Sequence, residues 1–445
     1  MKFERNTLQN FVFIGVLVFL ISCQKTEFDE FKISSGSADF SNYVSFGNSL
    51  TQGYSDGGLH NELGQQDNSY PAIIARQMKL AFPGLNFKQP TVTGRGSGYM
   101  HLEYIHKEIK VIKAYDPGLV PLTDNHPLAI AEDPSWATYG SDKTIKYNNM
   151  GISGFKLVNV VGGGNTSANV NYFVSNVNPY ARFLNWGPSN AMISYLDHIK
   201  ASNATFFTNW LGNNDVLGWS TAGGDDGFES QFNQYFSKLS DVTEFHDKYD
   251  SVLTALKSMG AKGVCATIPD VTSIPYFKTV TLQSVGKDVW FIEGPYSLNP
   301  GSVRKANAED LILLNASDEL AKGIGLTQAK PLPHDFVLDK TEKLLAQARS
   351  IDFNNQIKLL AAKHGFAVAD MYTYMKTLES GLTFDGVTFS PKYIEGGVFS
   401  LDGVHPNNRG YALIANKFIE TINQYYGSNL PPVIVGNFRG INFPE

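Results

Sequence analysis

The chain has 445 residues, of which 42% are hydrophobic and 18% are charged. These fractions are typical of globular proteins, and the length allows up to about three domains. The formal net charge of −6 and the isoelectric point near 5.9 argue against a nucleic-acid-binding protein, which would need a basic face.

The first 22 residues predict a lipoprotein signal peptide. Lys2 and Arg5 precede an apolar run from Phe11 to Ile21, shorter than the about 20 residues of a membrane span. Leu20-Ile21-Ser22-Cys23 resembles a bacterial lipobox, in which the cysteine is acylated. Lipidation of Cys23 would anchor the protein in the bacterial cell envelope, at the outer membrane, on either its periplasmic or its surface face. The alternative is a plain secretory signal with an unrelated cysteine.

Residues 23–40 are polar and predict a flexible tether. The β-forming residues from Asn42 to Phe46 then predict a strand. A helix is expected from Ser69 to Leu80, with Pro71 in its first turn, where proline is tolerated. Ser49 is therefore expected in the connection between this strand and this helix.

The alternation of strands and helices continues along the chain. Further strands are predicted at Thr205–Asn209, Gly263–Ile268 and Phe366–Ala369, and helices at Glu244–Met259, Thr341–His364 and Arg409–Tyr425. This pattern predicts an α/β protein, with a parallel sheet covered by helices on both faces. In such sheets ligand sites lie at the C-terminal edge of the strands.

Three long stretches do not fit the alternation: residues Pro83–Lys146, Gly218–Asp241 and Ser273–Asp335. Loops of this length are usually functional or have local structure of their own. We interpret them as insertions that wall the functional site of one domain, residues 41–428. Residues 429–445, with Pro431 and Pro432, predict an extended C-terminal tail.

Three polar motifs lie close to predicted strand ends or to the start of the last helix. They are Gly47-Asn48-Ser49-Leu50, Gly212-Asn213-Asn214-Asp215 and Asp402-Gly403-Val404-His405. In chain order they supply a serine, an amide and an Asp/His pair. A hydrolase that attacks esters through a serine uses these groups.

Ser49 is the candidate nucleophile and His405 the candidate base, because the pKa of histidine is naturally near neutral. Asp402 lies three residues before His405, a spacing that lets its carboxylate hold the other imidazole nitrogen. Taken alone, Ser49 would more simply be a helix cap and His405 a loop residue. The combination of the motifs favours catalysis.

These blocks, together with Asn149-Met150-Gly151-Ile152-Ser153-Gly154, resemble those of the SGNH/GDSL hydrolases over most of the chain from Tyr43 to Tyr426. The resemblance implies a flavodoxin-like three-layer α/β/α sandwich with long loop insertions. It also implies an oxyanion hole of the Ser49 and Gly154 N–H groups and the Asn214 side chain. Gly154 is preferred to Gly151 because it matches the later glycine of the block.

One position departs from the family pattern. The family usually has aspartate where this chain has Asn48, which keeps the shape and loses the charge. Asp215 is interpreted as a structural partner of its loop and not as a second acid. His101 and His106 do not form a zinc-binding pattern, so neither a metal nor a cofactor is predicted.

The sequence therefore predicts a serine esterase or acylhydrolase that cleaves carboxylic esters of lipids or acetylated carbohydrates through an acyl-enzyme on Ser49. The expected partners are this ester substrate and, through the lipid anchor, a membrane. The rival hypothesis is a non-catalytic surface lipoprotein that binds glycans on an esterase-like scaffold. The aromatic-rich insertions and Asn48 motivate the rival, whereas Ser49, Asn214, Asp402 and His405 together argue against it.

Overall fold

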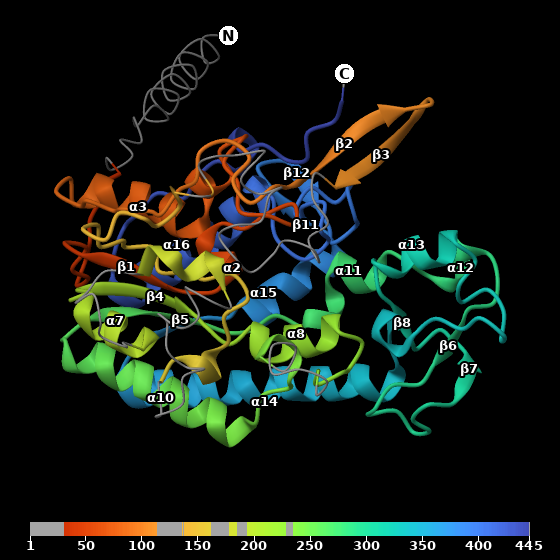
Figure 1. Cartoon of the computed structure of the whole chain (residues 1–445). Coiled ribbons are helices and arrows are strands. Elements are labelled where there is room, and N and C mark those ends of the chain that lie inside the picture. The colour runs from red at the N-terminus through yellow and green to blue at the C-terminus, as the bar shows by residue number, and fades with distance from the viewer. Residues whose placement is uncertain are drawn as a thin grey trace, which may run out of the picture. The chain divides into compact units, whose positions relative to one another are not determined.

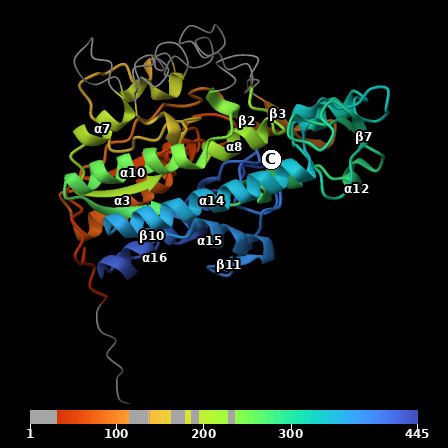
Figure 2. The same ribbon diagram turned by 90° about the horizontal axis from the view of Figure 1, so that it is seen from below.

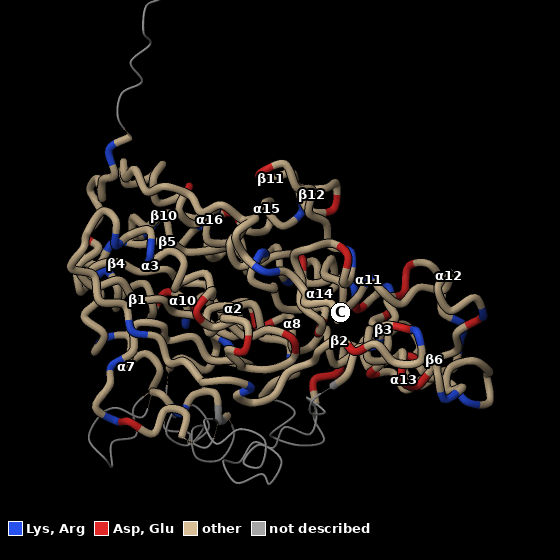
Figure 3. The backbone as a smooth tube through the Cα atoms, turned by 90° about the horizontal axis from the view of Figure 1, so that it is seen from above, with Lys and Arg blue, Asp and Glu red and all other residues tan. Residues whose placement is uncertain are grey.

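The computed structural model describes residues 31–113, 136, 138–161, 178–184, 194–227 and 235–444. The predicted signal peptide and Cys23 lie outside these ranges. Among the described residues, no helix has both the length and the apolar character needed to cross a bilayer. Acidic and basic residues are interspersed along this part of the chain (Figure 3).

A four-stranded parallel sheet forms the centre of the fold. Its order is β1-β4-β5-β10, with strands β1 (Tyr43–Gly47), β4 (Phe206–Trp210), β5 (Lys262–Ala266) and β10 (Ala367–Ala369). On the outer side of β1, Asn149 forms an isolated parallel bridge with Ser45. Every residue of β1 and β4 is buried, as expected for parallel strands covered on both faces. The predicted parallel α/β architecture is confirmed.

Helices cover both faces of the sheet, which gives three layers (Figures 1 and 2). On one face, Tyr70 of α3 stacks on Phe418 of α16 with ring centroids 4.9 Å apart. On the other face, Phe245 of α10 stacks on Phe353 of α14 at 3.9 Å. The helices of the two faces are α3 (Tyr70–Ala81) and α16 (Asn408–Tyr426), and α7 (Tyr195–Ala201), α10 (Val242–Ser258) and α14 (Lys340–His364).

The boundaries of these helices follow from capping chemistry. Asp339 and Glu342 form a reciprocal capping box at the start of α14, and Gly365 ends the helix in the left-handed conformation. Asp241 caps α10 by accepting from two backbone N–H groups. The strands and helices that the sequence predicted for the central layers begin and end within about two residues of the observed ones.

The three insertions contain structure that the sequence did not specify. One carries a hairpin of β2 and β3, and another begins inside α8. In the third, residues such as Val289, Phe291 and Leu332 form a second small hydrophobic core. The elements are β2 (Met100–Ile105), β3 (Glu108–Lys113), α8 (Asn214–Thr221), α11 (Pro275–Lys278), α12 (Leu282–Val285), β6 (Trp290–Ile292), β7 (Val303–Lys305), β8 (Leu311–Ile312), α13 (Ala316–Ala321) and β9 (Val337–Leu338). Near the C-terminus follow α15 (Met371–Thr377), β11 (Leu382–Phe384) and β12 (Val387–Phe389).

The predicted tether over residues 23–40 is wrong at its C-terminal end. Ser34 pairs with Asn429, and the N–H of Ser37 donates to the carbonyl of Tyr426 at 2.8 Å. Phe40 is 1% exposed and meets Phe206 edge-on, with centroids 5.1 Å apart. The segment is polar overall, so its composition did not indicate that Phe40 would be buried.

The C-terminal segment also packs onto the domain. Leu430 and Val435 are buried. Asn416 of α16 exchanges two hydrogen bonds with the backbone of Val433, at 2.8 and 2.9 Å. Segments from both ends of the domain, around Ser37 and around Val433, are therefore fixed beside α16.

The packing of Phe40 predicts a stability effect. Phe40→Ala removes a buried aromatic side chain and should lower the free energy of unfolding by about 3–5 kcal/mol. Phe443→Ala is the matched control, because Phe443 is 50% exposed and its truncation should change stability little. Equal denaturation midpoints for the two variants would show that residues 34–40 do not belong to the core.

Candidate active site

Ser49 is placed by a tight strand-to-helix turn. β1 ends at Gly47, and the short helix α2 (Ser49–Gln52) begins at once. The Oδ1 atom of Asn48 caps this helix by accepting from the N–H of Leu50 at 3.2 Å. A Cβ atom at Gly47 would lie 1.9 Å from the hydroxyl oxygen of Thr51, so the turn has no room for a side chain there. The turn places Ser49 at the C-terminal edge of the sheet.

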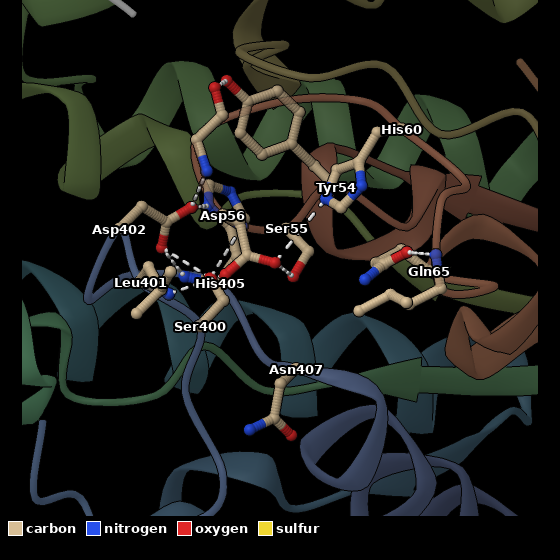
Figure 4. A network of polar contacts seen from close by, with 12 residues as sticks. Tyr54, Ser55, Asp56, His60, Gln65, Ser400, Leu401, Asp402, His405 and Asn407 are labelled. Carbon is tan, nitrogen blue, oxygen red and sulfur yellow. Dashed lines mark hydrogen bonds and ion pairs between the residues drawn. The ribbon is translucent and has the colours of Figure 1, made fainter. Parts of the chain in front are cut away.

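The structure brings Ser49, His405 and Asp402 into one hydrogen-bonded chain. The Ser49 Oγ lies 2.8 Å from the Nε2 of His405. The Nδ1 of His405 lies 2.8 Å from the Oδ2 of Asp402 (Figure 4). An Nδ1–H that donates to the carboxylate leaves Nε2 free to accept the serine proton.

The carboxylate of Asp402 is held by a dense set of donors. Its Oδ1 accepts from the Ser400 hydroxyl at 3.0 Å and from the N–H groups of Val404 and His405, each at 2.8 Å. Its Oδ2 accepts from the N–H of Gly57 at 2.9 Å, in addition to the imidazole. Burial would raise the pKa of Asp402, but His405 and these hydrogen bonds lower it to about 2. Asp402 is therefore charged at neutral pH.

Residues that sequence analysis did not single out complete this arrangement. Tyr54 lies against the imidazole of His405, with ring centroids 4.7 Å apart, and its hydroxyl donates to the carbonyl of Gly57. The Ser400 hydroxyl contacts both Asp402 and the N–H of Asp56. Tyr54 and Asp56 follow Ser49 closely in sequence, in the connection between the first predicted strand and the helix at Ser69–Leu80, with no motif to mark them.

Asn214 borders the same pocket as Ser49 and His405. It begins α8, and its Nδ2 donates to the carbonyl of Phe155 at 3.0 Å. This bond uses one of the two N–H groups of the amide and fixes the direction of the other.

Gly154 precedes Phe155 in a loop that is hydrogen-bonded to α2, the helix that begins at Ser49. The Oε1 of Gln52, on α2, accepts from both the N–H and the hydroxyl of Ser153 at 2.7 Å. Gly154 has φ +76°, which favours glycine, and a Cβ there would meet the ring of Phe236 at 2.7 Å. Within the described residues, no acceptor pairs with the N–H of Ser49 or of Gly154.

Asp215 holds a loop, as predicted, and does not face the serine. Its carboxylate accepts from the N–H groups of Leu157 and Val158 and from the hydroxyl of Ser240, at 2.7–3.2 Å. Desolvation by burial raises its pKa despite the nearby Lys156 ammonium and these donors. Its contacts fix the segment that follows Gly154.

A small apolar pocket opens beside Ser49 and His405. It has a volume of about 50 Å³, and its apolar lining includes Leu217, Val271 and Ile274. Asn48 also borders it, with a buried Nδ2 that has no partner among the described residues. Within the described ranges, no group of three or more His, Cys, Asp or Glu side chains could hold a metal ion.

A family comparison now identifies the class of protein. The model described as GDSL-like lipase/acylhydrolase matches residues 43–418, most of the chain. The chain therefore belongs to the GDSL-like lipase/acylhydrolase family, which makes it an ester hydrolase by family. A comparison with curated proteins found no significant match.

Solved structures include similar folds at low identity. The acetylxylan esterase Axe2 from Geobacillus stearothermophilus is 12% identical, with a TM-score of 0.37, over 89% of this chain and 98% of that one. LAE5, an alpha/beta hydrolase enzyme from the metagenome of Lake Arreo, Spain, is 13% identical, with a TM-score of 0.34, over 87% and 96%. The assignment to the family therefore depends on the family match and not on these structures.

The low pKa of Asp402 predicts part of the acid sensitivity of the fold. The folded value of about 2 lies below the roughly 3.9 of an unfolded aspartate. This charge therefore contributes stability above about pH 4 that is lost as the pH falls towards 2, worth about 2–3 kcal/mol. Urea unfolding between pH 5 and pH 2 should show a smaller loss for Asp402→Asn than for the wild type.

The control for this experiment is Asp247→Asn, at an exposed position on α10, which should retain the wild-type dependence on pH. Parallel curves for Asp402→Asn and the wild type would contradict the prediction.

Proposed function

We propose that the protein is a serine esterase that cleaves short-chain carboxylic esters through an acyl-enzyme on Ser49. The observation that carries the proposal is the continuous chain from Asp402 through His405 to Ser49, with both hydrogen bonds at 2.8 Å. In this geometry a base contacts the hydroxyl and a charged carboxylate orients the base.

The first half of the reaction forms the acyl-enzyme. The Nε2 of His405 removes the proton from Ser49 as Oγ bonds to the acyl carbon, and the carbonyl electron pair moves onto oxygen. Asp402 stabilises the imidazolium that results and stays ionised. When the tetrahedral intermediate collapses, the C–O bond to the alcohol breaks, and His405 gives its proton to the departing oxygen.

The second half repeats these steps with water in place of serine. His405 removes a proton from water, whose oxygen attacks the acyl carbon, and the returning proton releases Ser49. The acid product then leaves, and the enzyme is regenerated.

The oxyanion of each tetrahedral intermediate needs fixed donors. We assign this role to the N–H groups of Ser49 and Gly154 and to the Nδ2 of Asn214. The two backbone groups have no acceptor within the described residues, and Asn214 is oriented by Phe155. Donors that are positioned in advance cost no reorganisation when charge develops, and each is worth about 3–4 kcal/mol.

The small apolar pocket supports a short acyl group. Its volume of about 50 Å³ is far below the about 300–1,000 Å³ of typical small-molecule sites. A pocket this small is matched to an acetyl or propionyl chain and not to a fatty acyl chain. The sequence left two substrate classes open, and the small pocket favours acetylated carbohydrates over lipids with long acyl chains.

We also propose that the protein is attached to the bacterial cell envelope. The lipobox-like Leu20-Ile21-Ser22-Cys23 supports acylation of Cys23 and attachment to the cell envelope. The compact domain starts at Ser34, which pairs with Asn429. About ten residues of the sequence therefore lie between Cys23 and the domain and could serve as a linker to the lipid anchor.

The assignment of Ser49 predicts the effect of its removal. Ser49→Ala should lower the turnover of p-nitrophenyl acetate by about 10⁴-fold or more, because the nucleophile is lost. Its thermal unfolding should match the wild type. A fluorophosphonate probe should label the wild type at Ser49 and leave the variant unlabelled.

The same experiment decides between the two hypotheses from the sequence. An unlabelled, inactive wild-type protein would favour the non-catalytic glycan-binding lipoprotein. Full activity of Ser49→Ala would overturn the assignment of the nucleophile.

The pocket volume predicts a preference for short acyl chains. The ratio kcat/KM should be roughly tenfold or more higher for p-nitrophenyl acetate than for the octanoate, because the longer chain does not fit. Leu217→Ala enlarges the pocket and should narrow this ratio, whereas Leu359→Ala, at an exposed position of α14, should not. Faster octanoate hydrolysis by the wild type would exclude the pocket as the acyl site.

A further inference from the structure

A second, larger cavity lies beside the loop that holds Asp402 and is lined by Leu401, Asn407 and Asn408 of that part of the chain. Its volume is about 400 Å³, and it shares no lining residue with the pocket beside Ser49. Its walls come from the segment after α2, the base of the β2–β3 hairpin, the start of α16 and the C-terminal residues 440–442. These parts of the chain, distant in sequence, converge on a space that the proposed ester chemistry does not use.

The lining of the cavity is mostly polar and mixed in charge. Asp56 and Glu62 contribute carboxylates, Arg95 a guanidinium, and Gln65 and Asn408 amides. His101 adds an imidazole. Such a set offers both donors and acceptors, and its two carboxylates outnumber its one permanent cation, the guanidinium. The cavity is therefore matched to a ligand that both donates and accepts hydrogen bonds and carries no negative charge.

One buried side chain is left incomplete in this cavity. Asn408 is 3% exposed, and its Nδ2 donates to the carbonyl of Leu63 at 3.2 Å. Its Oδ1 is buried and has no partner among the described residues. A buried acceptor without a donor is costly, and a ligand hydroxyl in the adjoining cavity is the kind of group that would supply one.

The size of the cavity suits a small molecule. Its volume of about 400 Å³ lies within the range of about 300–1,000 Å³ that is typical of small-molecule sites, and it has room for one sugar ring. Tyr99 adds an aromatic wall that is held flat against His60, with centroids 4.2 Å apart. A rigid aromatic wall among polar side chains is preorganised to bind a neutral polyhydroxylated ring.

Asp56 connects this cavity to the catalytic loop. Its Oδ1 accepts from the N–H of Leu401 at 2.8 Å, and its own N–H donates to the hydroxyl of Ser400 (Figure 4). Ser400 in turn donates to Asp402. One wall of the cavity is therefore also the support of the catalytic carboxylate.

We propose that this cavity is a sugar-binding site that takes one neutral glycosyl residue, separate from the site of ester cleavage. The sugar's hydroxyls donate to Asn408 Oδ1 and to the carboxylates, and they accept from the amides and the guanidinium. Binding here does not depend on the proposed esterase activity, because no group of the cavity reacts.

Calorimetry on the full chain carrying Ser49→Ala tests the proposal without interference from turnover. The probes are the unacylated neutral sugars glucose, xylose, N-acetylglucosamine and xylobiose, with glucuronate as the anionic comparison. We expect at least one neutral sugar to bind with a 1:1 ratio, and glucuronate to bind about tenfold or more weakly than glucose. No binding of any neutral sugar, or equal binding of glucuronate, would overturn the proposal.

Two variants locate the site. Asn408→Leu, in the same Ser49→Ala background, should weaken sugar binding about tenfold, and the matched Asn437→Leu, at an exposed position, should leave it unchanged. Glu62→Gln, also at an exposed position, should strengthen glucuronate binding by several-fold and change glucose binding little. If Asn408→Leu does not fold, the Glu62→Gln result decides, and unchanged glucuronate binding there overturns the assignment.

Discussion

The buried negative charge of Asp402 is the constraint on which the site depends. A carboxylate removed from water must be compensated, and here five hydrogen bonds from Gly57, Ser400, Val404 and both the backbone and the ring of His405 do so. Gly57 is 345 residues away from Asp402 in sequence. The charge can therefore be accommodated only when the segment after Ser49 is docked against the loop before α16.

This requirement links folding to catalysis. The docking that satisfies Asp402 also sets His405 against Tyr54 and brings its Nε2 to the Ser49 hydroxyl. Asp56 helps to hold the two segments together, because its carboxylate accepts a hydrogen bond from the N–H of Leu401. Its φ of +54° is a conformation that aspartate tolerates better than most residues. Ser49 and His405 are thus aligned by contacts that the fold needs in any case to compensate a buried ion.

The parts of the molecule that could be predicted from the sequence are those governed by local periodicity and by short motifs. The central strands and the helices α10, α14 and α16 have regular apolar spacing, and Ser49, Asn214, Asp402 and His405 lie in recognisable blocks. Phe40 was missed because a single apolar anchor in a polar segment has no period. Tyr54 and Asp56 were missed because their role consists of contacts across the chain, which no local pattern encodes.

Asn48 and the second cavity bear on what kind of hydrolase this is. Either asparagine or aspartate can cap α2, so the change from the family's usual residue keeps the turn that presents Ser49. It removes a second negative charge from the neighbourhood of Ser49 and leaves a buried Nδ2 beside the small pocket. The surroundings of Ser49 are accordingly apolar and narrow, whereas the larger polar cavity has a separate set of lining residues. The proposed ester cleavage and the proposed sugar binding therefore use different cavities and do not compete for the same space.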